Sequence, residues 1–224
     1  MLPALSRCPS FRRDGDESAR MQTGSLAHAM LERLLKTGGA PDADFADLAM
    51  DDRAAVEWAF GKIIELTPTT RLIEHRLSVQ LDFEEVTFGT ADVIAGPIGD
   101  APVRVVDYKH GHPGHPYDEQ LMAYALGAMD LYGSTSAECT ILYGSARQMQ
   151  AWRVTMADCE RMLRDVLASA QNPAPRPCEF CDWCASALTC PALSGEVVRV
   201  AAEYAQPAPF DLATYHASEI TQPE

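Results

Sequence analysis

Residues 88–111 read FGTADVIAGPIGDAPVRVVDYKHG and predict two strands joined by a turn of Pro, Gly and Asp. The first strand carries Asp92, and the second carries Asp107 and Lys109. Since side chains two residues apart share a face of a strand, Asp107 and Lys109 point the same way, and the residues flanking them point the other way. If the two strands pair as a hairpin, Asp92 lies near Asp107.

This arrangement places two carboxylates and one ammonium around a small space, on strands made mostly of Val, Ile and Ala. Carboxylates that close repel each other unless a cation lies between them, and a hard divalent metal is the simplest such cation. An acidic pair with a lysine suits hydrolysis of a phosphodiester. The alternative is a surface hairpin whose acids and lysine are solvated.

Three short motifs in this order, GTADVI, VVDYK and QLMAY, resemble the PD-(D/E)XK nuclease superfamily in its RecB-like branch. The first acid of that pattern is Asp92, the D-x-K is Asp107-Tyr108-Lys109, and the Q-x-x-x-Y runs from Gln120 to Tyr124. Each motif alone is weak, because D-x-K occurs by chance in many chains. The ordered set on strand, strand and helix is much more specific.

The resemblance implies that Asp92 and Asp107 bind Mg²⁺ or Mn²⁺, together with the backbone carbonyl of Tyr108. It also implies that Lys109 orients the attacking water and stabilises the charge that grows on the phosphate.

A helical residue, His28, completes the expected metal ligands. The segment GSLAH, residues 24–28, resembles the G-x-x-x-H element that precedes the RecB-like core. Without that resemblance, a lone histidine on a helix is more often structural than a ligand.

The expected helix after the D-x-K carries Gln120 and Tyr124, which are four residues apart and share a face. The resemblance implies that both side chains face the active site and help to place the DNA backbone. Both can hydrogen-bond phosphate oxygens. The alternative is a plain amphipathic helix with a glutamine at its edge.

Periodicity predicts the remaining elements and an α/β fold with a mixed central sheet flanked by helices, which the resemblance refines to a restriction-endonuclease-like core. Residues 1–20 are expected to be irregular. Glu74 stands near the start of a strand, where an acid assists the metal site in related nucleases, although an exposed glutamate at a strand end is commoner. The patterns predict helices at 18–36, 51–66, 117–131 and 156–170, and strands at 72–81, 137–143 and 149–155.

A histidine-rich stretch, HGHPGH at residues 110–115, follows Lys109. Its Gly and Pro residues indicate a turn-rich loop at the mouth of the active site, in a position to touch substrate. The alternative is a metal site, because short His-rich tracts bind soft or borderline metals.

Four cysteines lie close together at positions 178, 181, 184 and 190, after a Pro-rich lead-in. Thiolates at C-x-x-C spacing select zinc or an iron–sulfur cluster, and spacing alone does not choose between them. Four local cysteines could close a zinc site unaided. Cys139 and Cys159 lie in a predicted strand and helix, and we expect both to be core residues.

Cys8 stands far away in an Arg-Cys-Pro context. The whole set is similar to AddB-type and CRISPR-adaptation nucleases, in which one N-terminal and three C-terminal cysteines hold a [4Fe-4S] cluster. The resemblance implies Cys8, Cys181, Cys184 and Cys190 as ligands, with Cys178 as a surplus thiol or a substitute ligand. Such a cluster would act as a structural clasp between the N- and C-terminal segments.

Whole-chain properties limit the possibilities further. The 224 residues fit one nuclease domain over residues 1–192 with a tail over residues 193–224. A net charge of −14 argues against a protein that coats nucleic acid with its whole surface, without excluding a nuclease. We expect no membrane span and no secretory peptide, and hence a cytoplasmic protein with reduced cysteines.

The predicted function is a Mg²⁺- or Mn²⁺-dependent deoxyribonuclease, and more narrowly an exonuclease, that acts on single-stranded or free-ended DNA. Small members of this kind occur in phages and in recombination or CRISPR systems, which makes a helicase or recombination partner plausible. The alternative is a DNA-end-binding module, non-catalytic or dependent on a partner, that keeps a structural metal cluster.

Overall fold

The computed structural model describes residues 2–12, 19–38, 45–68, 70–114, 116–171 and 173–205. Its core elements are, in chain order, α2 (Ala19–Thr37), α3 (Met50–Leu66), β1 (Arg71–Leu81), β2 (Glu84–Ala95), β3 (Val103–Lys109), α4 (Asp118–Tyr132), β4 (Ser136–Tyr143), β5 (Gln148–Thr155) and α5 (Met156–Gln171).

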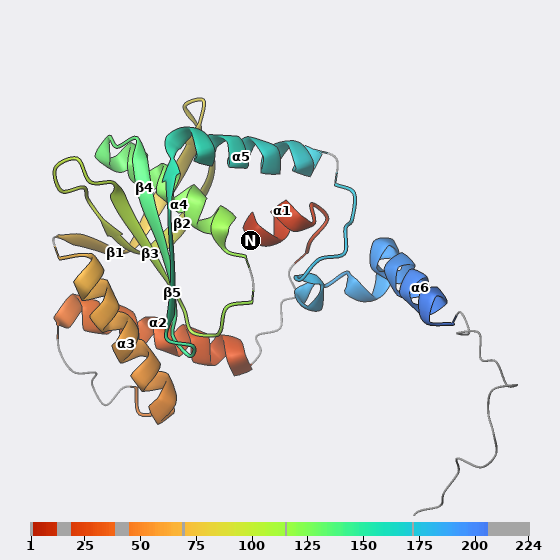
Figure 1. The fold of residues 1–224 in the computed structure, drawn as a ribbon, viewed down its shortest axis with the longest axis horizontal. Coiled ribbons are helices and arrows are strands. Elements are labelled where there is room, and N and C mark those ends of the chain that lie inside the picture. Colours follow the sequence, from red (N-terminus) through yellow and green to blue (C-terminus); the bar gives the residue numbers. More distant parts are fainter. Residues whose placement is uncertain are drawn as a thin grey trace, which may run out of the picture.

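The five strands form one sheet in the order β1-β2-β3-β4-β5, shown in Figure 1. Neighbouring strands are antiparallel except β3 and β4, which are parallel. Parallel neighbours need a long connection, and α4 supplies it by crossing one face of the sheet. The predicted α/β fold with a mixed sheet flanked by helices is therefore confirmed.

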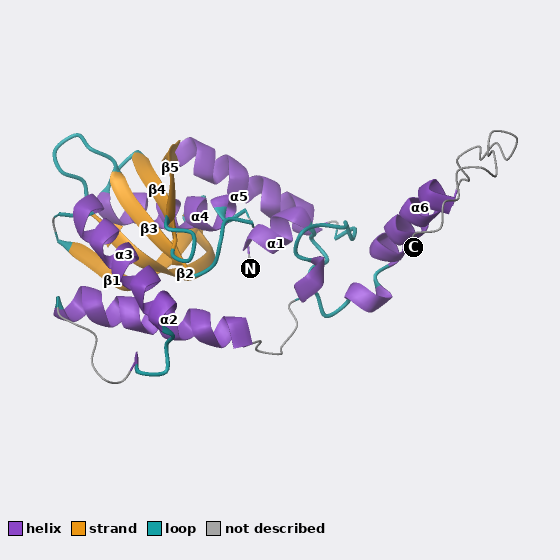
Figure 2. Ribbon diagram, turned by 60° about the horizontal axis from the view of Figure 1, so that its bottom comes forward, coloured by secondary structure: helices purple, strands orange, loops and turns teal. Residues whose placement is uncertain are grey.

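Helices cover the two faces of the sheet in pairs, as Figure 2 shows from a second side. On one face, α2 and α3 pack against alternate residues of β2, β3 and β4, such as Val93, Val106 and Leu142. On the other face, α4 and α5 pack against the residues in between, such as Val105 and Ile141. The strand alternation seen in the sequence thus builds two buried layers.

A two-residue turn joins β1 to β2. Asp82 and Phe83 both have positive φ values, 54° and 67°, as a tight hairpin turn of this kind requires. The Asp82 carboxylate accepts two hydrogen bonds from Arg164 of α5, at 2.6 and 2.8 Å. This bidentate pair fixes the tip of the hairpin to α5. Phe83 is 99% exposed.

The N-terminal segment differs from the sequence-based expectation, because residues Leu2–Arg7 form a helix, α1. It is too short to show a helical period in the sequence. It packs against α4 and α5, and its Ala4 is buried in a cluster with Cys8, Phe11 and Phe180.

The C-terminal segment contains two short 3₁₀ turns, at Cys181–Trp183 and Ala187–Thr189, and then α6 (Pro191–Ala205). The division between domain and tail at residues 192 and 193 stays a prediction, and residues 206–224 lie outside the described residues. No helix in the described ranges is both long enough and apolar enough to cross a membrane.

Candidate active site and cysteine cavity

The predicted acids meet at the point where the neighbouring strands β2 and β3 stop pairing. Strand β2 pairs with β3 only over residues 93–95 and 104–106, although both strands continue beyond that point. The register places Asp92 opposite Glu74 of β1 and, one step past the last β2–β3 pair, opposite Asp107 of β3. We call Glu74, Asp92 and Asp107 the carboxylate cluster.

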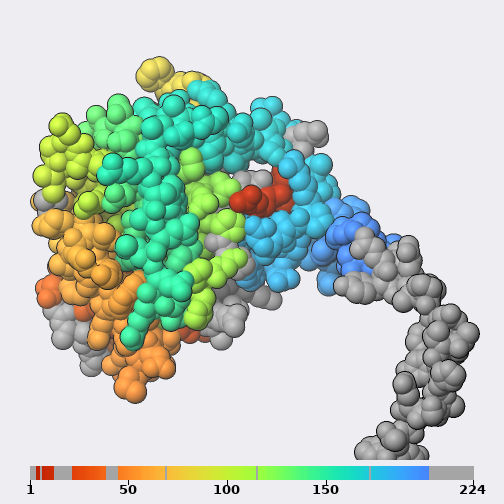
Figure 3. Space-filling model, viewed as in Figure 1, coloured from red at the N-terminus to blue at the C-terminus, as the bar shows by residue number. Residues whose placement is uncertain are grey.

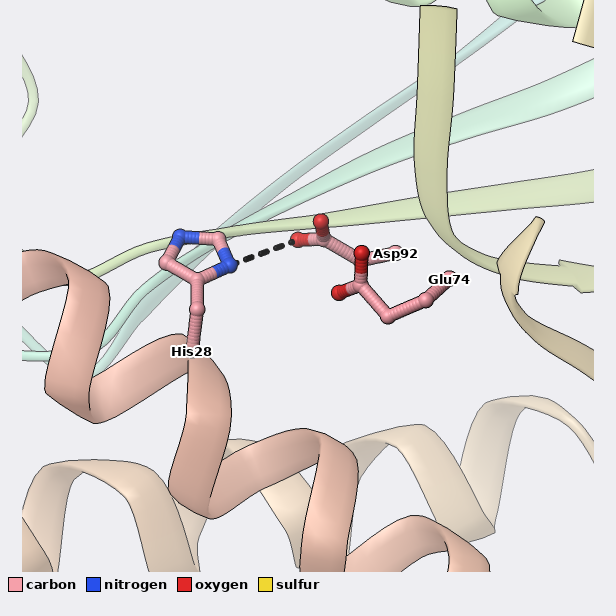
Figure 4. Close-up of side chains that lie close together, drawn as sticks. All are labelled: His28, Glu74 and Asp92. Atoms are coloured by element: carbon pink, nitrogen blue, oxygen red, sulfur yellow. Dashed lines mark ion pairs between the residues drawn. The ribbon is translucent and has the colours of Figure 1, made fainter. Parts of the chain in front are cut away.

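Where β2 and β3 stop pairing, the side chain of Asp92 replaces a missing backbone hydrogen bond between the two strands. The backbone N–H of Tyr108 donates to Asp92 Oδ2 at 2.7 Å, so the amide has a partner where the strands separate. His28 Nδ1 of α2 lies 3.5 Å from the same oxygen, as Figure 4 shows. Burial acts to raise the pKa of Asp92, but His28, Lys109 and the Tyr108 amide outweigh it and hold that pKa below its ordinary value.

Three of these groups can hold one metal ion. A nitrogen of His28 and oxygens of Glu74 and Asp92 all lie within 4.8 Å of one another, and Figure 4 shows the three side chains turned to a common space. Burial and the charges of Asp92 and Glu32 raise the pKa of Glu74 to about 7. Two carboxylates and one imidazole gathered around one space in this way suit a divalent cation, which would take the place of the proton that Glu74 retains.

Glu74 has an unusual backbone, with a φ of 49° inside a strand. A non-glycine residue in this region is strained, and such strain clusters at functional sites. Leu72 and Leu77 are five residues apart, which puts them on opposite faces of a regular strand. Both pack against the same buried cluster, so the facing of β1 reverses near Glu74.

Asp107 lies outside this group of three because it pairs with Lys109, whose Nζ is 2.7 Å from Asp107 Oδ2. Burial and Asp92 raise the pKa of Asp107, against the opposing effect of Lys109. Burial acts to lower the pKa of Lys109, but Asp107 and Asp92 outweigh it and raise that pKa. The lysine is therefore held as an ammonium, and a metal role for Asp107 stays a prediction.

Helix α4 lines the site from the other side of the sheet. Gln120 Nε2 donates to Tyr124 Oη at 2.9 Å. A Cβ at Gly89 of β2 would lie 2.5 Å from the Tyr124 ring, so glycine there lets this tyrosine approach the strand. The structure thus brings the predicted Gln–Tyr pair to the strands that carry the carboxylate cluster, and its contact with DNA stays a prediction.

The sequence reasoning did not single out Tyr117 as a site residue. Lys109 Nζ lies 4.6 Å from the centroid of the Tyr117 ring, which makes a cation–π contact. Residues 117, 120 and 124 are three and four apart, so they share a face of a helix, and this spacing is the sequence signal that identifies Tyr117 as a neighbour of Gln120 and Tyr124.

Asp52, His110 and Tyr108 form a hydrogen-bonded chain behind the site. Tyr108 Oη lies 2.8 Å from His110 Nδ1, and His110 Nε2 lies 2.9 Å from Asp52 Oδ1 of α3. The buried Tyr108 ring also meets the ring of His28 edge-on, with centroids 5.2 Å apart. A Cβ at Gly144 would lie 2.5 Å from Tyr108 Oη, so this glycine makes room for the tyrosine.

The position of His110 corrects the expectation for the histidine-rich stretch. Its side chain is only 14% exposed and turns inward to Asp52 and Tyr108. It therefore does not project outward, as a residue of a loop that touches substrate would. His112 is exposed, and His115 lies outside the described residues.

Five cysteines line one cavity of about 180 Å³ where the N-terminal segment meets residues 175–193. We call it the cysteine cavity, and its thiols belong to Cys8, Cys178, Cys181, Cys184 and Cys190. Figure 3 shows the N-terminal residues against the later segment, and the Ala185 N–H donates to the Arg12 carbonyl at 2.8 Å. The predicted meeting of Cys8 with the C-terminal cysteines is present, while the bound group and the choice of ligands stay predictions.

Backbone amides point at two of these sulfurs. The Arg176 N–H donates to Cys8 Sγ at 3.4 Å, and the Cys178 N–H donates to Cys181 Sγ at 3.2 Å. Such donors stabilise thiolates, the form in which cysteine binds metals. Cys139 and Cys159 are fully buried in the main core, as expected.

Comparisons with known proteins locate the chain in one family. No curated protein matches it. Among solved structures, it is similar to the crystal structure of SSO0001, with 14% identity over 85% of each chain and a TM-score of 0.39. It is also similar to an alkaline exonuclease (LHK-Exo) from Laribacter hongkongensis, with 15% identity over 90% of this chain and 93% of that one, and a TM-score of 0.34.

The family model for "Protein of unknown function (DUF2800)" matches residues 13–222, nearly the whole chain. The chain therefore belongs to the DUF2800 family.

Proposed function

We propose that this protein is a divalent-metal-dependent deoxyribonuclease with its active site at the carboxylate cluster. The observation that carries the proposal is the meeting of acids from β1, β2 and β3 with His28 and Lys109 at one division of the sheet. The sequence motifs predict four of these five groups, on three separate elements: α2, β2 and β3. Glu74 adds a third carboxylate to them.

His28, Glu74 and Asp92 would hold Mg²⁺ or Mn²⁺, since their donor atoms already surround one point. When bound, the cation supplies positive charge that polarises a phosphate and activates water. The N–H and C=O of one residue in a strand point to the same edge, and the Tyr108 N–H points to Asp92. The Tyr108 carbonyl and Asp107 therefore lie where they can complete the ligand set that the resemblance implies.

Lys109 is placed to act on the phosphate. Asp107 and the Tyr117 ring hold its ammonium from two sides, and the raised pKa keeps the proton on it. A fixed positive charge of this kind stabilises charge that grows on a phosphate in the transition state. Gln120 and Tyr124 supply donors for the phosphate oxygens on the α4 side.

The substrate in this proposal is single-stranded or free-ended DNA, and the action is exonucleolytic, as the RecB-like resemblance implies. A role in recombination, repair or phage DNA processing, with a helicase as partner, belongs to the same expectation. The competing function is a DNA-end-binding module that keeps the fold without cleavage.

The test is cleavage of end-labelled single- and double-stranded DNA by anaerobically purified protein with Mn²⁺, Mg²⁺ or EDTA. The wild type should cleave only with metal, and Lys109→Ala should lose at least about 100-fold in rate. Lys62→Ala is the matched control, because Lys62 pairs with Glu65 on the surface of α3. Cleavage that survives Lys109→Ala would place the active site elsewhere. Absence of cleavage in the wild type would favour the binding module.

We also propose that the cysteine cavity holds a [4Fe-4S] cluster with a structural role. Cys8 and the four cysteines of residues 178–190 line one cavity of about 180 Å³. Thiolates are the usual ligands of iron–sulfur clusters. The similarity to nucleases that hold a [4Fe-4S] cluster with one N-terminal and three C-terminal cysteines favours iron over zinc.

Iron, acid-labile sulfide and zinc contents of the anaerobic protein test this second proposal. The wild type should contain iron and sulfide in equal amounts, and Cys8→Ser should lose most of both. Cys139→Ser is the control, since Cys139 is buried in the main core and should keep the iron. One equivalent of zinc without iron would overturn the proposal.

A further inference from the structure

The β1–β2 hairpin carries a surface without acids next to the carboxylate cluster. Residues 75–81 of β1 and 86–91 of β2 contain no Asp or Glu, in a chain with a net charge of −14. The acids of the hairpin stand at its two ends, in the carboxylate cluster and around the turn. A polyanion can therefore approach the cluster along the middle of the hairpin without repulsion from carboxylates on these segments.

An exposed aromatic–cation pair lies on this surface. The guanidinium carbon of Arg76 is 4.0 Å from the centroid of the Phe88 ring, although Phe88 is 59% exposed. The neighbouring Gly89 faces Tyr124 of α4, so Phe88 points to the opposite face of the ribbon. A large ring left in solvent with a guanidinium against it presents a flat, cationic surface.

The pair also stands in line with the proposed active site. Phe88 and Asp92 are four residues apart on β2, which is about 13 Å along a strand. Arg76 and Glu74 are two residues apart on the neighbouring strand. Thr90, which is small and uncharged, is opposite Arg76 and lies between Phe88 and Asp92 on β2, and Ser78 is opposite Phe88.

We propose that Arg76 and Phe88 form a stacking site for one base of a single-stranded nucleic acid, whose backbone runs along the β1–β2 hairpin to the carboxylate cluster. The inference rests on the proposed nuclease function and specifies that the strand bound by the hairpin is unpaired. Stacking needs a base whose face is free, which a paired duplex does not offer. Arg76 adds attraction for the phosphates.

The same contact also stabilises a hairpin, as cross-strand side-chain pairs do in general. A structural pair of this kind would affect the melting temperature and leave base recognition unchanged. The experiment therefore compares ligands with and without bases.

Fluorescence anisotropy should be measured with labelled oligothymidylate and with an abasic oligonucleotide of the same number of phosphates, in Ca²⁺, which takes oxygen ligands. The wild type should bind the base-bearing oligonucleotide about fivefold or more tightly than the abasic one. Phe88→Ala should remove that preference and keep the abasic affinity, and Phe88→Trp should restore it. Phe83→Ala is the matched control, because Phe83 is exposed at the hairpin turn.

Equal binding of the two oligonucleotides by the wild type would overturn the stacking site, as would a preference that survives Phe88→Ala. Cleavage in Mn²⁺, measured on the same preparations, separates the two proposals. Cleavage without base preference would keep the nuclease and remove the stacking site. Base-dependent binding that needs Phe88, without cleavage, would keep the site and remove the catalytic function.

Discussion

The carboxylate cluster and the cysteine cavity are built in opposite ways. The carboxylate cluster stands on three neighbouring strands, with buried layers on both faces of the sheet. The cysteine cavity is made by loops, 3₁₀ turns and the first residues of the chain, around a cluster of four buried residues that includes Phe11 and Phe180. The sheet preorganises the first site, whereas the second would depend for its stability on the cluster proposed for it.

Asp92→Asn gives the largest expected effect in this comparison. The asparagine oxygen can still accept from the Tyr108 N–H, but the charge that would hold a metal is lost. Cleavage should fall by about 1,000-fold or more, while the melting temperature changes little. The measurement is a single-turnover rate beside a thermal melt, with Asp82→Asn as the surface control. A melting temperature that falls with the rate would mean that the cluster is structural.

Cys190→Ala should show the reverse pattern. Losing a ligand of the proposed clasp should remove iron and destabilise the fold by about 2–3 kcal/mol, or roughly 5–10 °C for a chain of this size. The Mn²⁺-dependent rate of the folded fraction should fall far less than in Asp92→Asn. Iron content and calorimetry on the same sample check this, with Cys159→Ala as the control. Unchanged stability and iron content would disprove the clasp.

Glu74 makes the stability of the metal-free protein depend on pH. Its pKa is raised from 4.5 to about 7, so between these values the folded chain keeps a proton that the unfolded chain releases. Stability in EDTA should therefore fall as pH rises from about 4.5 to about 7 and then level off. A bound divalent metal should suppress this loss of stability, because the metal takes the place of the proton on Glu74.

The contribution of Glu74 is isolated by Glu74→Gln. The difference in melting temperature between this variant and the wild type should grow over the same pH range, measured in EDTA. A constant difference from about pH 4.5 to about pH 8 would show that Glu74 keeps an ordinary pKa.

Tyr108→Phe should give the smallest effect. It removes the hydroxyl that meets His110 but keeps the backbone amide that binds Asp92. Stability should fall by about 1 kcal/mol, and cleavage by less than about tenfold. His110→Gln should behave similarly if the Asp52–His110–Tyr108 chain only positions the site. A loss as large as that of Asp92→Asn would give the hydroxyl a direct part in the reaction.

The sequence predicted the sheet well because its signals are local. Alternation along β1, the apolar runs of β3 and β4, and the turn residues between strands identify the strands. The ordered acids on β2 and β3 identify the candidate site. Helix α1 was missed because its packing partners, which are α4, α5 and the cluster around Phe180, lie far away in sequence.

The site was predicted less completely for the same reason. Glu74 was considered only loosely, because nothing local shows that the strand reverses its facing there. The inward turn of His110 depends on Asp52, which lies on a helix that precedes the sheet. The contact of Lys109 with Tyr117 had a sequence signal, the spacing of residues 117, 120 and 124, that was not used.

The cluster proposed for the cysteine cavity would also impose an order on biosynthesis. Cys8 is translated early, and at about 5–20 residues per second the strands are all translated before Cys190 is added. The proposed ligand set would therefore be complete only after residue 190 has been translated. Until then the N-terminal segment that carries Cys8 would stay accessible to proteases.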